Sequence, residues 1–174
     1  RSTPEQLLPG CRSILCVGLP YPPPLPPPAA EADKVCGKIA AYATLPDYRS
    51  ILSDKLKALA ARLPSLAERA VRWRICVDTA PILEKDYAFL AGLGWIGRNS
   101  LLLTPQFGSY VFLGELLTDL ELEPDQPLEG DPCAACYQCV QACPTHALLP
   151  ERSVDARRCL SYWTIEHRGP LPQS

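Results

Sequence analysis

The stretch that decides the fold is Cys133-Ala-Ala-Cys136-Tyr-Gln-Cys139-Val-Gln-Ala-Cys143-Pro144. Its spacing, C-x2-C-x2-C-x3-C-P, is typical of bacterial ferredoxins that hold two iron–sulfur clusters. In that pattern the first three cysteines bind one cluster and the fourth binds the other. Paired C-x2-C spacings also bind zinc, but three evenly spaced cysteines followed by Cys-Pro fit zinc poorly. The run therefore predicts an iron–sulfur module.

Length and composition limit what this module can serve. The chain has 174 residues, a formal charge of −2 and nine cysteines. This length allows one good core plus a small cluster module, and the balanced charge indicates no general attraction to nucleic acid. No apolar run of about 18 residues is present, so we expect no membrane span. Five cysteines lie in the cluster region, which favours a reducing cytosol over a disulfide scaffold.

The residues before the cysteine run predict an α+β domain over 1–128. Buried or half-buried strands are expected where apolar residues run together or alternate, and helices where they recur at helical spacing. We expect strands at 13–19, 71–77, 101–104 and 109–117, and helices at 33–43, 47–63 and about 81–90. Seven prolines in 20–28 predict an extended surface loop, and acidic residues with prolines make 121–131 a linker.

Two segments of this domain carry polar groups suited to chemistry. Asp78 follows the strand expected at 71–77, where an Asp acts either as a helix cap or as a catalytic acid. The residues alone favour the cap. Gly92 to Ser100 places three glycines before Arg98, Asn99 and Ser100, whose donors suit phosphate or amide groups. We reject a dinucleotide site there, because such sites need a strand before the glycines.

Several motifs together resemble the epoxyqueuosine reductase family. They are VDTAPILEK at 77–85, AGLGWIGRNSLLL at 91–103, GSYVFLGELLTDLEL at 108–122, the cysteine run, and DARRCLSYWTIEHRG at 155–169. The resemblance implies a cytosolic, monomeric enzyme that reduces epoxyqueuosine to queuosine at the wobble position of tRNA. It also implies cobalamin, two [4Fe-4S] clusters and an external electron donor of the flavodoxin or ferredoxin type. Residues 1–128 would then form a nitroreductase-like cobalamin domain, 129–160 a ferredoxin-type module, and 161–174 the start of a further segment.

The resemblance also assigns roles to individual residues. It makes Asp78 the proton donor, which reverses the preference for a cap. It gives Cys133, Cys136 and Cys139 to the first cluster, and Cys143 and Cys159 to the second. It places these residues near cobalamin: Arg1, Asp78, Lys85, Arg98, Asn99 and Ser161. The chain departs from the family pattern at Leu45 and Arg49, where the family usually has glycine and the histidine of Asp-Tyr-His.

Two four-iron clusters need eight thiolates, whereas the cluster region supplies five. The chain also begins with Arg1 and lacks methionine, so we expect part of a longer protein, with the three missing ligands beyond Ser174. The isolated piece should then hold iron poorly and be inactive. Cys11, Cys16, Cys36 and Cys76 are expected to reach no cluster. Two other functions stay open: a corrinoid reductase of the reductive dehalogenase type, and a plain electron-transfer module.

Overall fold

The structure is a computed structural model that describes residues 2–23 and 39–170. Arg1, most of the predicted proline-rich loop and most of the helix predicted at 33–43 lie outside these residues. The described end of that predicted helix is only a single 3-10 turn, η2 (Ala41–Thr44). The prediction of an α-helix is therefore wrong for the described residues of this range. The short turn ends at Leu45, which is extended and stands just before Pro46. Proline disfavours helix in the residue before it.

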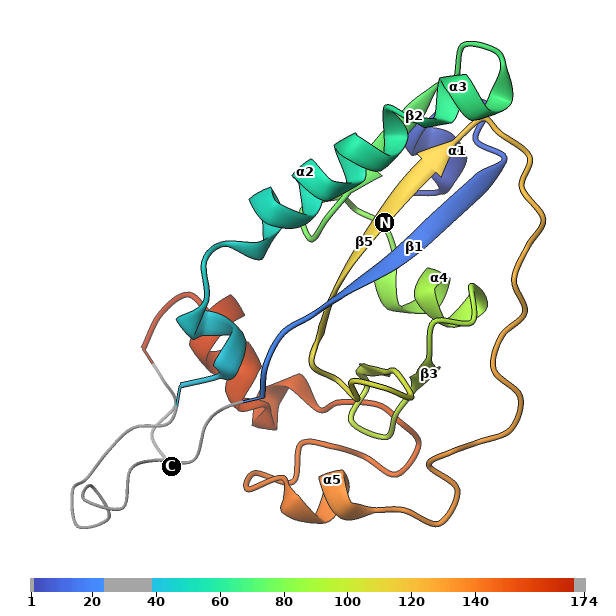
Figure 1. Cartoon of the computed structure of the whole chain (residues 1–174). Coiled ribbons are helices and arrows are strands. Elements are labelled where there is room, and N and C mark those ends of the chain that lie inside the picture. Colours follow the sequence, from blue (N-terminus) through green and yellow to red (C-terminus); the bar gives the residue numbers. More distant parts are fainter. Residues whose placement is uncertain (1, 24–38, 171–174) are drawn as a thin grey trace.

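A three-stranded antiparallel sheet forms the centre of the domain (Figure 1). Its strands are β1 (Ser13–Pro20), β2 (Trp73–Cys76) and β5 (Val111–Thr118), in the order β1-β5-β2. This confirms the predicted central sheet. β5 lies between the other two strands and its last five residues are buried, because both of its edges are paired and both of its faces are covered.

Helix α2 (Tyr48–Ala60) covers one face of the sheet. Its buried residues Leu52 and Leu56 pack against Leu116 of β5. They lie so close that a Cβ on Gly114 would come within 2.9 Å of Leu52. The single helix predicted over 47–63 is wrong in its extent, because α2 ends at Ala60. A separate short helix, α3 (Leu63–Ala67), follows and has proline in its first turn, a position that proline tolerates well.

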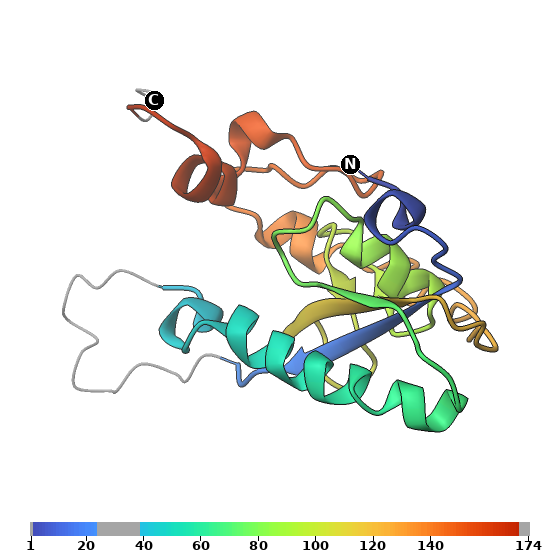
Figure 2. The same cartoon turned by 90° about the horizontal axis from the view of Figure 1, so that it is seen from above.

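The opposite face of the sheet carries α1 (Pro4–Leu7) and α4 (Glu84–Leu90), as Figure 2 shows. Leu7, Cys76, Ile82 and Leu117 form its apolar core. The predicted helix near 81–90 is confirmed, but it begins at Glu84. The loop between β2 and α4 is therefore longer than expected, and it contains Asp78.

The remaining elements lie toward the cluster segment. β3 (Trp95–Ile96) and β4 (Leu102–Leu103) form a two-stranded sheet; β4 confirms the strand predicted at 101–104, whereas β3 was not predicted. Residues 121–131 form no helix or strand and run along the outside of the molecule to the cysteines (Figure 1). Three short helices follow: α5 (Gln138–Ala142), η3 (Ala156–Arg158) and η4 (Tyr162–Glu166). None of the described helices is long and apolar enough to cross a membrane.

Candidate active site and metal centre

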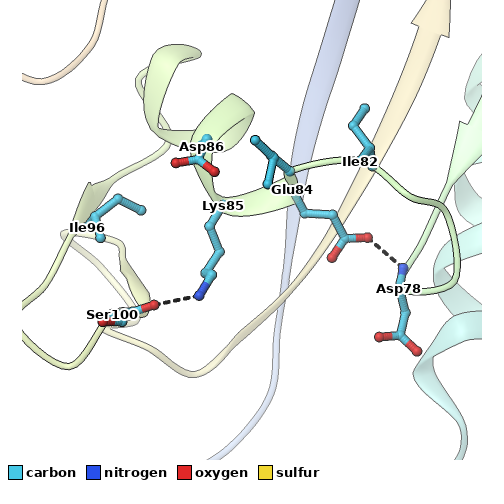
Figure 3. A pocket seen from close by; sticks show the side chains of 8 residues that line it. Asp78, Ile82, Glu84, Lys85, Asp86, Ile96 and Ser100 are labelled. Atoms are coloured by element: carbon cyan, nitrogen blue, oxygen red, sulfur yellow. Dashed lines mark hydrogen bonds between the residues drawn. The ribbon is translucent and has the colours of Figure 1, made fainter. Parts of the chain in front are cut away.

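Asp78 lines a cavity of about 370 Å³ between β2, α4 and the loop that holds Ser100 (Figure 3). It is not a helix cap, because α4 begins at Glu84 with Leu83 in the capping position. Its side chain is 49% exposed, so the cavity reaches it while solvent still has access. Its backbone is left-handed, with φ of 59°, a conformation that aspartate and asparagine tolerate better than most residues.

The side chain of Glu84 holds the turn at Asp78 in place. The backbone N–H of Asp78 donates a hydrogen bond of 2.5 Å to Oε1 of Glu84 (Figure 3). Burial raises the pKa of Glu84, whereas the bond from Asp78 lowers it. A carboxylate that accepts a backbone N–H fixes that peptide. Glu84 therefore stabilises the left-handed turn that presents Asp78 to the cavity.

One of the two departures from the family pattern meets Asp78 directly. Arg49, in the first turn of α2, places Nη1 3.5 Å from Oδ2 of Asp78. The same guanidinium also pairs with Asp47, the residue that caps α2. Both partners of the Arg49–Asp78 pair are about half exposed, so the pair adds little stability. Leu45 is half-buried at the end of η2.

A second cavity, of about 450 Å³, joins the Asp78 cavity to the cysteines. Lys85 and Ser100 line both cavities, and Nζ of Lys85 donates a 2.6 Å hydrogen bond to the Ser100 carbonyl. Asn99 and Ser161 line the second cavity as well. The structure thus brings together four of the predicted cofactor-binding residues, Asp78 included, around two adjoining spaces.

Arg98 does not join them. Its guanidinium donates hydrogen bonds to the carbonyls of Ala134 (2.6 Å) and Pro150 (2.8 Å), and it lies 4.1 Å from the centre of the Tyr137 ring. All three partners belong to the cluster segment. Arg98 therefore fastens that segment to the α+β domain, while its predicted role at cobalamin has no support from its position.

The predicted cluster ligands fall into two surroundings. Cys139, Cys143 and Cys159 line the second cavity, whereas Cys133 lies against the indole of Trp95 and Cys136 is exposed. The thiol of Cys143 accepts a hydrogen bond from the backbone N–H of Ala147 (3.3 Å), and such bonds lower its pKa to about 7. An easily formed thiolate beside free space suits an iron ligand.

The cysteines of the α+β domain offer a different environment. Burial, with Glu115 nearby, raises the pKa of Cys16 to about 12, and burial also raises the pKa of Cys76 and Cys11. Thiols held neutral in this way are poor metal ligands. Cys36 lies outside the described residues.

The sulfur positions also bear on which metal group fits. Among residues 2–23 and 39–170, no three His, Cys, Asp or Glu side chains are close enough to share one metal ion. In a four-iron cluster each thiolate binds a different iron, so the sulfurs lie farther apart than around a single zinc ion. The spread cysteines are therefore compatible with clusters, which the free space beside Cys143 and Cys159 can accommodate.

Glu115 is a buried acid that the sequence analysis missed, although it stands out as the one charge in the apolar run of β5. It lies in the middle of the sheet, opposite Cys16 on one side and Cys76 on the other. Its side chain is fully buried, and neither carboxyl oxygen has a hydrogen-bond partner among the described residues. Burial, and secondarily Glu84, raise its pKa from about 4.5 to about 8.

Glu115→Gln should remove a pH dependence of stability. The folded state keeps the proton up to about pH 8, whereas the unfolded state releases it near pH 4.5. The folded state therefore loses stability as pH rises between these values, by up to about 1.4 kcal/mol per pH unit. Urea unfolding at pH 5.5 and pH 8 should show the variant gaining on the unmodified protein at the higher pH. An equal difference at both pH values would contradict the prediction.

The fold and the site define an iron–sulfur protein in which a ferredoxin-type cysteine segment packs on an α+β domain with an acid-lined cavity. Residues 1–79 match the family model described as epoxyqueuosine reductase QueG, DUF1730, and residues 132–174 match that of the 4Fe-4S double cluster binding domain. The chain is 45% identical over 173 residues to the epoxyqueuosine reductase of Gloeobacter violaceus, covering 98% of this chain and 52% of that protein. Over nearly its whole length the chain is therefore similar to epoxyqueuosine reductases.

Solved structures of epoxyqueuosine reductases are similar to this chain in fold and in sequence. One is an epoxyqueuosine reductase crystallised with a tRNA-Tyr epoxyqueuosine-modified stem loop, with a TM-score of 0.83 and 34% identity over 99% of this chain. Another, from Bacillus subtilis, has its catalytic aspartate loop swung out of the active site; its TM-score is 0.81 and its identity 33% over 99% of this chain. This chain covers 45% of each of them and thus spans about half the length of the relatives it matches.

Proposed function

We propose that this protein reduces epoxyqueuosine in tRNA to queuosine, with Asp78 as the proton donor. The observation that carries the proposal is the adjoining pair of cavities, one with Asp78 in its wall and the other with Cys139, Cys143 and Cys159. An acid and an electron source then face one space. The similarity to epoxyqueuosine reductases and the tRNA stem loop in the structure of a relative support this substrate class.

Loss of an epoxide oxygen consumes two electrons and two protons, and it yields an alkene and water. Negative charge develops on the oxygen as its bonds to carbon break, so an acid beside it lowers the barrier. The half-exposed carboxyl of Asp78 lines the cavity and regains a proton from solvent after each turnover. The catalytic aspartate loop of the Bacillus subtilis relative is consistent with such a role for a loop aspartate in this family.

The electrons would come from two [4Fe-4S] clusters. The first would be held by Cys133, Cys136 and Cys139, the second by Cys143 and Cys159, with further ligands from outside this chain. The match to a double-cluster domain supports both. A flavodoxin- or ferredoxin-type protein would reduce them one electron at a time. We place the enzyme in the cytosol, because its cysteines suit a reducing compartment, and the resemblance to the family implies that it acts as a monomer.

Cobalamin completes the proposed set of cofactors, in an α+β domain of the nitroreductase-like type. Lys85, Asn99 and Ser161 would hold it, because they line the space between Asp78 and the cysteines. Arg1, which the resemblance also assigns to cobalamin, lies outside the described residues. When bound, cobalamin supplies a strong two-electron reductant. Lys85 orients one wall of this space through its bond to the Ser100 carbonyl.

The test uses the reconstituted holoprotein, with both clusters, their complete set of ligands and cobalamin. It is mixed with tRNA that carries epoxyqueuosine in the presence of a chemical reductant. Nucleoside mass spectrometry should show the loss of one oxygen atom, and tRNA that already carries queuosine should not change. Halide release from a chlorinated small molecule, with the tRNA unchanged, would instead favour the dehalogenase alternative. Fully loaded protein that does neither would be a plain electron-transfer module.

A further inference from the structure

We propose that Trp95 raises the reduction potential of the cluster that Cys133 ligates, through an N–H···S hydrogen bond. The indole Nε1 of Trp95 lies 3.4 Å from Sγ of Cys133, within the range of such bonds. Both side chains are half-buried. The inference rests on the proposed cluster at Cys133, and it gives the segment from Gly94 to Arg98 a function that its sequence did not predict.

The fold positions this indole closely. Trp95 lies on β3, opposite Leu103 of β4. The residue before it must be glycine, since a Cβ on Gly94 would collide with the carbonyl oxygen of Leu103. This close contact fixes the backbone of β3 beside Trp95, whose indole N–H reaches Sγ of Cys133 in the cluster segment. Indole nitrogen only donates hydrogen bonds, so its partner sulfur is the acceptor.

The positive charge of Arg98, at the other end of the segment from Gly94 to Arg98, also raises the reduction potential of this cluster. Its guanidinium covers the ring of Tyr137, which stands between the ligands Cys136 and Cys139 in the sequence. Its two hydrogen bonds to backbone carbonyls fix the charge in place. Nε of Arg98 is buried and has no partner among the described residues.

Both features favour the reduced cluster. Reduction adds one electron to a cluster whose thiolate ligands already make it negative. Hydrogen bonds to the sulfurs and the local net charge are among the factors that set the potential of such clusters. An N–H donor bonds more strongly to the more negative state. Loss of the Trp95 donor should therefore make reduction less favourable, by about tenfold in the equilibrium constant, which corresponds to about 59 mV for one electron.

The measurement is a redox titration of the holoprotein followed by electron paramagnetic resonance. Trp95→Phe keeps the ring and removes the donor, and we expect it to lower one of two midpoint potentials by the amount above. Trp73→Phe is the matched control, since Trp73 is exposed on β2, and it should change neither potential. Unchanged potentials in a Trp95→Phe protein with both clusters loaded would overturn the inference. Unmodified holoprotein that has its complete set of cluster ligands and still binds no iron would instead overturn the proposed function.

A second measurement covers a variant that fails to load. The holoprotein is grown with ¹⁵N-indole tryptophan, and pulsed electron paramagnetic resonance is recorded on the reduced clusters. A coupling to ¹⁵N is expected from Trp95. It should persist in Trp163→Phe, since Nε1 of Trp163 donates to the Arg157 carbonyl rather than to sulfur. No ¹⁵N coupling in the labelled, reduced protein would contradict the proposed hydrogen bond.

Discussion

Asp78→Asn should lower turnover on epoxyqueuosine tRNA by a factor of about 10² to 10⁴, the usual contribution of a general acid. The amide has nearly the shape of the carboxyl group but has no acidic proton to transfer. Binding of tRNA and the content of iron and cobalamin should stay the same. The loss should therefore fall on the rate constant measured in a single turnover, and should leave the Kd for tRNA unchanged.

Asparagine is the right replacement because of the backbone at this position. Asp78 is left-handed, and asparagine adopts this conformation about as readily as aspartate. Its N–H still donates to Glu84, so the turn is kept. Asp54→Asn serves as the control, because Asp54 lies on the exposed side of α2, where it pairs with Lys57. Normal turnover by Asp78→Asn would show that Asp78 is not the proton donor.

Cys143→Ala should remove one of two clusters and with it nearly all activity. By the ligand count, iron should fall from about eight to about four per chain in the holoprotein. Cys143 combines a thiol pKa lowered to about 7 with a place in the wall of the second cavity. Iron and acid-labile sulfide per chain are the quantities to measure, together with the spectrum of the remaining cluster.

Cys11→Ala provides the comparison for this experiment. Cys11 lies on the apolar side of the sheet near Leu7 and Ile14, and burial raises the pKa of its thiol. The variant should keep its full iron content. If Cys11→Ala lost iron and Cys143→Ala kept it, the division between cluster ligands and core cysteines would be wrong.

The sequence predicted the sheet because its strands are strongly patterned. The apolar run at 13–19 and the alternation at 71–77 left little choice, and β1 and β2 lie within one residue of these predicted ranges or inside them. The helix after Asp47 was predicted too long, because the apolar spacing continues through Leu63 while the chain turns after Ala60. Periodicity finds an element more reliably than it finds its end.

The site was only partly predictable, because its key contacts join segments far apart in the chain. Arg98 was expected at a cofactor because of the family resemblance, but its partners, Ala134 and Pro150, are 36 and 52 residues away. No local pattern encodes such a contact. The role of Glu84 depends on the unusual turn at Asp78, which single-residue propensities do not predict. The cysteines proposed as metal ligands could be selected from the sequence alone, since their spacing is local.

In the proposed enzyme, the contacts of the cysteine segment with the α+β domain would also govern the rate of electron delivery. Arg98 reaches Ala134 and Pro150, and Arg152 of the segment donates to the Ile96 carbonyl at 3.1 Å. The ion pair of Arg152 with Asp131, at 2.6 Å, lies within the segment. These arginines brace the segment at several points, although the linker before it is irregular. Electron tunnelling slows exponentially with distance, so a braced segment transfers charge at one well-defined rate, where a loosely tethered one would give a broad distribution of rates.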